Sequence, residues 1–513
     1  MRQIPYRAAI LFGLAVGTLA RAADVPVVHL DTGIISGISG STSEVRVYKG
    51  IPFATPPLGN LRWRAPQPAA HWDGVRKAEK FSPTCMQNAN GPAAQPANED
   101  CLYLNVWTAA KLATERRPVM VWIYGGGFTG GSGSEPRYDG DALSQKGVVV
   151  VTFNYRLGPF GFLAHPELTK ESDRRASGNY GLMDQVAALE WVQRNIPAFG
   201  GDPRKVTIFG ESAGAISVAD LLASPQSKGL FIRAIGESGA WMGLGFAKAR
   251  RLPEAEEAGV KLAEALGAKS LVEMRQAPAD AVLKSGRGSG PIVDGWFLPE
   301  EPNAVFAQGK QHPVPVMVGS NKDEGTFFLQ PTTAEKFTAQ SRQRFGVMAD
   351  SFLKAYPAAS DEEANASQPE AFRDEAAWAM SNWARFTSKA GKRAYLYYFT
   401  HEPPAAPGAV VRARGATHVA EVPYVFSVPG NRPWTDVDRE LADTMSSYWV
   451  NFASTGDPNG RNLPKWPPFD EAKNHNPMVL GDKVAVGSGP NPVHLKFYEN
   501  YSNNYLKQQA AGQ

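Results

Sequence analysis

The sequence VTIFGESAG at residues 206–214 carries the clearest structural pattern of this chain. Its first four residues are β-branched or aromatic, which is typical of a buried parallel strand, and residues 213–223 are rich in alanine, leucine and valine, which predicts a helix. The GESAG segment matches the Gly-x-Ser-x-Gly pattern of a serine on a tight strand-to-helix turn, where the two glycines let strand and helix approach each other closely. We therefore expect the Ser212 hydroxyl to project from the top of a sheet, beside the amide of Ala213.

The rest of the chain alternates between apolar, β-branched stretches and stretches with helical periodicity. Strands are predicted at residues 25–30, 33–38 and 44–49, which suit a small antiparallel sheet, and at residues 102–107, 118–124, 147–155, 233–235, 314–319, 394–400 and 494–498. Helices are predicted at residues 179–195, 253–266 and 440–452, with a helical insertion over the upper edge of the sheet at residues 333–388. This alternation predicts an α/β fold with a large, mostly parallel central sheet and helices on both faces.

The first 22 residues have the features of a cleaved signal peptide. A basic start precedes an apolar run at residues 8–20, and Ala20, Arg21 and Ala22 form a cleavage signal; an uncleaved membrane anchor is the alternative. We expect residues 23–513 to form a single exported domain, periplasmic or extracellular, whose oligomeric state the sequence leaves open. Composition agrees with a globular protein, since 43% of the 513 residues are hydrophobic and 20% are charged.

Removing this segment also changes the charge of the protein. Residues 1–22 contain three arginines and no acidic residue, so their loss lowers the formal net charge from +3 to zero. No dense basic run occurs elsewhere, which argues against a nucleic acid or an anionic membrane as partner. No later stretch is apolar enough to span a membrane.

The chain has two cysteines, Cys85 and Cys101. Export would place them in an oxidising compartment, so we expect a disulfide that closes a short loop rich in small residues. Two free thiols or two metal ligands are the alternative, but neither a histidine nor a second cysteine pair lies nearby. No metal and no cofactor are expected.

A nucleophilic serine requires a base, an orienting acid and donors for an oxyanion. The segment YGGGF at residues 124–128 follows a predicted strand, and consecutive glycines allow backbone amides to turn toward a developing negative charge. This glycine-rich loop is the candidate oxyanion hole.

The base and the acid are less clearly marked. The chain order of serine, acid and histidine leaves His312, His401 and His418 as reasonable candidates among the eight histidines. His418 is favoured, because it lies in a loop of small residues. The acid belongs after the strand predicted at residues 314–319, where Asp323 and Glu324 are both eligible.

Together these features resemble the type-B carboxylesterases, the family that includes the cholinesterases and bacterial para-nitrobenzyl esterases. The resemblance runs nearly end to end, through YKGIPFATPPLGNLRWRAP (48–66), EDCLYLNVW (99–107), VWIYGGGF (121–128), NYRLGPFGFL (154–163), FGGDPRKVTIFGESAGA (199–215), NKDEGTFF (321–328) and YWVNFASTGDPN (448–459). It implies an α/β-hydrolase fold. The site that it implies consists of Ser212 as nucleophile, Glu324 as acid, His418 as base, Gly126, Gly127 and Ala213 as oxyanion donors, and a disulfide between Cys85 and Cys101. In the family pattern the second carboxylate of the DEG element is the acid, which favours Glu324 over Asp323.

Two departures from the family bear on the substrate. The loop at residues 86–100 has no aromatic residue, whereas acetylcholinesterase binds the choline cation on a tryptophan there, which argues against choline esters. The segment KSGRGSG at residues 284–290 replaces bulky acyl-pocket side chains, so we expect a roomy pocket, with Arg287 and Trp241 as candidate lining residues. Arg287 would pair with a free carboxylate on the acyl group or, alternatively, point into solvent.

The function that follows is a secreted serine carboxylesterase acting on small-molecule esters. A lipase acting on aggregated lipid and a non-catalytic, adhesion-type relative are the alternatives.

Overall fold

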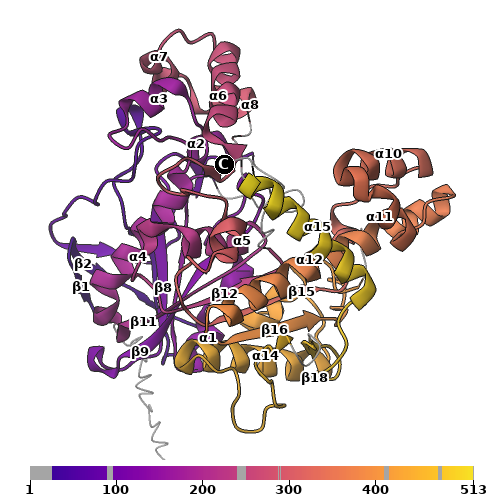
Figure 1. Ribbon diagram of the computed structural model, residues 1–513. Coiled ribbons are helices and arrows are strands. Elements are labelled where there is room, and N and C mark those ends of the chain that lie inside the picture. The colour runs from indigo at the N-terminus through magenta and orange to yellow at the C-terminus, as the bar shows by residue number, and fades with distance from the viewer. Residues whose placement is uncertain are drawn as a thin grey trace, which may run out of the picture.

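The computed structural model describes residues 26–88, 96–239, 250–286, 288, 290–408, 415–471 and 476–511. Within these residues the core is an 11-stranded sheet with the order β18-β17-β16-β15-β12-β11-β9-β10-β8-β4-β3 (Figure 1). Its strands are β3 (Ile38–Ser39), β4 (Arg46–Pro52), β8 (Tyr103–Thr108), β9 (Arg117–Ile123), β10 (Val149–Phe153), β11 (Gly201–Glu211), β12 (Arg233–Glu237), β15 (Val316–Asn321), β16 (Ala394–Phe399), β17 (Met478–Leu480) and β18 (Ala485–Val486). The strands from β10 through β17 pair in parallel, and those at both edges pair antiparallel.

Helices cover both faces of this sheet. In Figure 1, α5 and α12 lie on one side of the strands, and α1 and α14 lie on the other. The helices are α1 (Asp141–Gln145), α2 (Gly158–Gly161), α3 (Pro166–Glu171), α4 (Tyr180–Asn195), α5 (Ala213–Ala223), α6 (Leu252–Leu266), α7 (Leu271–Gln276), α8 (Ala279–Ser285), α9 (Pro302–Ala307), α10 (Ala334–Phe345), α11 (Ala349–Ala355), α12 (Asp361–Lys389), α13 (Val422–Phe426), α14 (Asp436–Thr455) and α15 (Pro492–Ala511). Helices enclose the sheet on both faces, so a central strand such as β10 can consist of the fully buried run VVVTF. The α/β fold class is therefore as predicted.

The helical stretch predicted at residues 333–388 forms α10, α11 and α12. The second half of α12 packs on β15 and β16 and buries Trp378, Met380 and Trp383. By contrast, α10 and α11 extend away from the sheet (Figure 1).

The strand β8, for which no direction was predicted, is antiparallel to both its neighbours, β10 and β4. Two details of the predicted strand arrangement were wrong. The small N-terminal sheet contains β1 (Val28–Leu30), β2 (Gly33–Ser36) and β5 (Val75–Lys77), while β4 joins the large sheet. Residues 494–498, predicted as the last strand, lie in α15, where Tyr498 donates a hydrogen bond to the carbonyl of Ala371 (2.7 Å).

Two short ribbons complete the described strands. They are formed by β6 (Thr84–Cys85) with β7 (Ala97–Asn98), and by β13 (Arg250–Arg251) with β14 (Ile292–Val293). Among the described residues, none of the helices combines the length and the apolar character needed to cross a bilayer.

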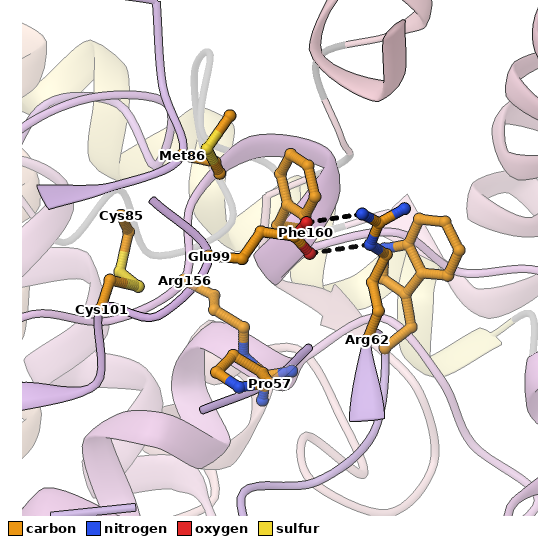
Figure 2. A pocket seen from close by; sticks show the side chains of 9 residues that line it. Pro57, Arg62, Cys85, Met86, Glu99, Cys101, Arg156 and Phe160 are labelled. Atoms are coloured by element: carbon orange, nitrogen blue, oxygen red, sulfur yellow. Dashed lines mark hydrogen bonds and ion pairs between the residues drawn. A yellow bond between two sulfur atoms is a disulfide. The ribbon is translucent and has the colours of Figure 1, made fainter. Parts of the chain in front are cut away.

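A partly buried ion pair supports the region of the disulfide. Cys85 and Cys101 are bonded to each other, with their Sγ atoms 2.03 Å apart. Figure 2 shows a small pocket beside this bond, lined also by Arg62, Glu99 and Arg156. The Arg62 guanidinium donates to both carboxylate oxygens of Glu99, at 2.5 and 2.7 Å. Glu99 lies two residues before Cys101, so the ion pair and the disulfide fix the same end of the loop.

Candidate active site

Ser212 lies on a sharp turn between β11 and α5. Its backbone has φ 55° and ψ −123°, a conformation that residues other than glycine rarely adopt. The turn is held by a hydrogen bond from the Ser212 N–H to the carbonyl of Glu237, at 2.9 Å. Ala213 is the first residue of α5, so its amide lies at the positive end of the helix dipole.

The two glycines of the motif permit the close approach that the turn requires. A Cβ atom on Gly210 would lie 2.6 Å from the carbonyl oxygen of Ile123, and one on Gly214 would lie 1.9 Å from the same atom. The end of β9 therefore passes directly beneath the turn, and a side chain at either position would collide with its backbone.

The glycine-rich segment that follows β9, which we call the oxyanion loop (residues 124–131), lies against Ser212. A Cβ atom on Gly125 would lie 2.9 Å from the Cβ of Ser212. Gly126 and Gly127 have φ values of +110° and +62°. The carbonyl of Gly126 accepts hydrogen bonds from the N–H groups of Thr129 and Gly130, both at 3.1 Å, which closes the loop on itself. The structure thus brings the loop carrying Gly126 and Gly127 together with Ser212 and Ala213.

His418 lies between Glu324 and the residue that precedes Ser212. Its Nδ1 is 2.6 Å from Oε2 of Glu324, and its Nε2 is 3.1 Å from Oε1 of Glu211. Both His418 and Glu324 are buried. The imidazole therefore lies between Glu324 and the turn that carries Ser212.

Asp323 and Glu324, which the residues alone could not separate, make different contacts. Glu324 lies just after β15, and its Oε1 accepts the backbone N–H of Asn321 at 2.9 Å. The Oδ2 of Asp323 instead accepts the backbone N–H of Ala416 at 2.8 Å, and the Asp323 N–H donates to the Ala416 carbonyl at 2.9 Å. Glu324 contacts the His418 imidazole, whereas Asp323 bonds to the backbone of the loop that carries His418.

The other two candidate bases are engaged elsewhere. His312 Nε2 lies 2.7 Å from the carbonyl of Ser224. His401 lies between Asp438 and Asp482, at 2.9 and 2.5 Å from their carboxylates. The structure places neither of them with Ser212.

A group of buried carboxylates lies near His418 and the Ser212 turn, and sequence reasoning did not identify it. Glu211, Glu237 and Glu421 are all buried. Glu421 accepts hydrogen bonds from the Ser238 hydroxyl (3.2 Å) and the Asn321 amide (2.5 Å), and Glu237 accepts one from the Trp449 indole N–H (2.8 Å). Glu211 could have been noticed inside the GESAG motif, but Glu237 and Glu421 join the site only through tertiary packing.

These carboxylates determine the protonation of the site. Burial by itself would lower the pKa of His418, but the charges of Glu211 and Glu324 outweigh it and raise this pKa to about 9. Burial raises the pKa of Glu211 to about 8, and the charge of His418 opposes that shift. Burial, followed by the charge of Glu324, raises the pKa of Glu421 to about 7. The Glu211 and Glu324 carboxylates therefore favour the protonated form of the His418 imidazole.

Phe328 is a second feature that sequence reasoning missed. Its ring centroid lies 4.8 Å from that of His418 and 5.8 Å from that of Phe372. The Phe328 side chain is also 45% exposed. It provides an apolar surface next to the imidazole, and the aromatic pair at the end of NKDEGTFF was the available signal in the sequence.

The candidate acyl-pocket residues, Arg287 and Trp241, lie outside the described residues. One group of possible metal ligands occurs among the described residues, formed by Glu370, Asp374 and His494. The guanidinium of Arg373 donates to both of these carboxylates, at 3.0 and 2.8 Å, so the group is a hydrogen-bonded ion-pair network between α12 and α15.

Comparison with known proteins identifies the family of the chain. Residues 24–498 match the model of the carboxylesterase family. The chain is 40% identical to fumonisin B1 esterase of Sphingopyxis macrogoltabida over 491 residues, which cover 90% of this chain and 87% of that protein. It is 34% identical to para-nitrobenzyl esterase of Bacillus subtilis (strain 168), over 88% of this chain and 95% of that protein.

A solved structure of a PNB esterase superposes with a TM-score of 0.79 at 34% identity, covering 92% of this chain and 99% of the other. With the fold, the family match and the esterase relatives in agreement, the chain belongs to the carboxylesterase family and is a carboxylic ester hydrolase with the α/β-hydrolase fold.

Proposed function

We propose that this protein is a serine carboxylesterase that works through an acyl-enzyme intermediate, with Ser212 as nucleophile, His418 as base and Glu324 as orienting acid. The observation that carries this proposal is the position of the His418 imidazole, bonded to Glu324 through Nδ1 and reaching the serine turn through Nε2. The strained backbone of Ser212 is further support, because such strain is common at functional sites.

Each residue has one role in the proposed reaction. His418 removes the proton of the Ser212 hydroxyl as its oxygen attacks the ester carbonyl carbon, and the resulting imidazolium is stabilised by Glu324. The tetrahedral oxyanion accepts hydrogen bonds from the amides of Gly126, Gly127 and Ala213. The C–O bond to the alcohol then breaks, and His418 donates its proton to the leaving oxygen. In the second half, His418 activates water, which attacks the acyl-enzyme and releases the acid and free Ser212.

The experiment that tests this function uses a p-nitrophenyl ester. Wild-type protein should hydrolyse it and should be labelled with one equivalent of a fluorophosphonate probe, whereas Ser212→Ala should be inactive and unlabelled. Activity in Ser212→Ala, or a label on another residue, would refute the assignment of the nucleophile.

We infer that the acyl pocket is roomy and that its substrates are not choline esters. The small residues at positions 284–290 and the lack of aromatic residues at positions 86–100 support this inference.

Within this pocket, Arg287 would pair with a free carboxylate on the acyl group. The Arg287→Ala substitution should then raise KM for a succinate monoester and leave KM for a neutral ester of the same size nearly unchanged. Equal effects on both substrates would remove the carboxylate-binding role and leave only the claim of a roomy pocket.

We also infer that the protein is exported and that residues 23–513 form a single domain. The basic start, the apolar run and the cleavage signal of residues 1–22 support this inference. Intact-mass analysis of protein recovered from the periplasm or the medium should give an N-terminus near Ala23. Protein that retains Met1 in the membrane fraction would instead indicate an uncleaved anchor.

A further inference from the structure

We propose that Gln87 is a positioning residue for the oxyanion loop, and that through Gln87 the Cys85–Cys101 disulfide supports the rate of catalysis. This inference rests on the proposed function, because it assigns a support to the loop that would stabilise the oxyanion.

The Gln87 amide pairs with both backbone groups of one residue of the oxyanion loop. Its Nε2 donates to the carbonyl of Gly131 at 2.8 Å, and its Oε1 accepts the N–H of Gly131 at 2.9 Å. A planar primary amide that makes two such bonds fixes the orientation as well as the position of the peptide groups that it contacts. The Gln87 side chain therefore bonds the N–H and the carbonyl of Gly131 as a neighbouring β-strand would.

Gly131 transmits this constraint to the donors of the oxyanion hole. It has φ +107°, and a Cβ atom there would lie 2.7 Å from the carbonyl oxygen of Gly125 and 2.6 Å from the Tyr124 ring. The backbone of Gly131 thus packs closely on the start of the loop, and a Cβ atom added to Gly125 would in turn lie 2.9 Å from the Cβ of Ser212. A displacement of Gly131 cannot occur without moving the segment that carries Gly126 and Gly127.

The disulfide fixes the other end of this connection. Gln87 follows Cys85 by two residues, and its Nε2 also donates to the carbonyl of Cys85 at 3.1 Å. Cys85 is buried and is paired through β6 and β7 with the segment that carries Glu99. Near Cys101, Glu99 is held by the ion pair with Arg62 that Figure 2 shows. The disulfide, the pairing of β6 with β7 and the Arg62–Glu99 ion pair therefore fix the position of the segment that carries Gln87.

The expected consequence is kinetic. Donors that move lose their alignment with the oxyanion of the transition state, whereas the ground-state ester depends on them less, so a loosened loop lowers kcat more than it raises KM. Loss of one oxyanion donor costs about 100- to 1,000-fold in kcat, so loosening the loop without removing a donor should cost about tenfold.

The test compares Gln87→Ala with Gln193→Ala. Gln193 also makes two side-chain bonds to backbone carbonyls, of Pro203 and Leu230, but at the end of β11 opposite Ser212. Both variants lose bonds of the same kind, so both should show a modest fall in Tm. Only Gln87→Ala should show a kcat about tenfold lower with KM within twofold of wild type. Gln87→Glu, which keeps the acceptor for the Gly131 N–H but places a carboxylate opposite the Gly131 carbonyl, should not restore kcat.

A second arm tests the link to the disulfide. Mild reduction of the wild type should lower kcat to the level of Gln87→Ala, and reduction of Gln87→Ala should lower kcat no further. A wild-type kcat in folded Gln87→Ala, or equal loss in Gln193→Ala, would overturn the positioning role. A kcat that reduction leaves unchanged would overturn the link to the disulfide. Ser212→Ala separates this inference from the proposed function: an inactive Ser212→Ala beside a fully active Gln87→Ala overturns the inference alone, whereas an active Ser212→Ala overturns both.

Discussion

At the scale of single residues, the proposed site depends on one imidazole that contacts two carboxylates. His418 bonds Glu324 through Nδ1 and lies close to Glu211 through Nε2, so every change in its position or charge should alter the reaction. Since Ser212, His418 and Glu324 would act as one unit, their separate contributions should not add.

We therefore expect His418→Ala to reduce kcat for a p-nitrophenyl ester by about 10⁴-fold or more, to the level of Ser212→Ala. The double variant should be no slower than either single variant, because each already lacks the complete unit. Steady-state kinetics of the three proteins measure this. A double variant that is slower by the product of the two effects would show that the two residues act independently.

The two adjacent acids should differ sharply on substitution. Glu324→Gln removes the negative charge from the imidazole, and we expect a fall in kcat of about 10⁴-fold. Asp323→Asn keeps an oxygen that can accept the N–H of Ala416, so its kcat should fall less than tenfold. If Asp323→Asn were the inactive variant, the assignment of the acid would be wrong.

The charge of Glu211 should set the pH at which the enzyme loses activity. This carboxylate raises the pKa of His418, and activity requires the neutral imidazole, so kcat/KM should fall as the pH drops below that pKa. Glu211→Gln removes the charge and lowers the pKa of His418. The acid limb of the pH profile of kcat/KM should then move to lower pH by about one unit or more. A limb that stays in place would mean that another group controls it.

At the scale of secondary-structure elements, the turn around Ser212 requires glycine at positions 210 and 214, where the backbone passes next to β9. The Cβ of an alanine at position 214 would lie 1.9 Å from the carbonyl oxygen of Ile123, so β9 and α5 would have to separate. We expect Gly214→Ala to lower the free energy of unfolding by about 3 kcal/mol or more, measured by denaturant titration. The control is Gly489→Ala, because a Cβ there would meet its nearest atoms at 3.5 Å. Similar stability of the two variants would contradict the close approach.

The elements that could be predicted from the sequence are those with a strong local pattern. α5 begins and ends at the predicted residues, because the Gly-x-Ser-x-Gly turn marks its start and an alanine-rich run its extent. The direction of β8 could not be predicted, since an apolar strand at an antiparallel edge has the same composition as a parallel one. In α15, apolar residues at 493, 495 and 497 imitate a strand, and only packing on α12 shows the helix.

At the scale of the whole molecule, residues far apart in the chain meet at one end of the sheet. β11 and β15 lie on either side of β12, so Ser212 and Glu324 follow the same ends of two parallel strands that are separated by one strand. The loop of His418 then reaches them through the backbone pairing of Asp323 with Ala416. Chain order limited the histidines to three, but the choice of His418 and the carboxylates around it depend on contacts that no local pattern contains.

The disulfide should contribute to the stability of the whole protein. It closes a loop of about 15 residues, and in the chain-entropy model such a crosslink stabilises the folded state by about 3 kcal/mol, because it restricts the unfolded chain. The bidentate pairing of Arg62 with Glu99 should persist after reduction, so the reduced protein should remain folded but melt at a lower temperature. For a chain of this length, a loss of that size should lower Tm by a few degrees. Thiol titration of the denatured, unreduced protein should find no free sulfhydryl, and the titration of two thiols in that protein would show that the bond does not form.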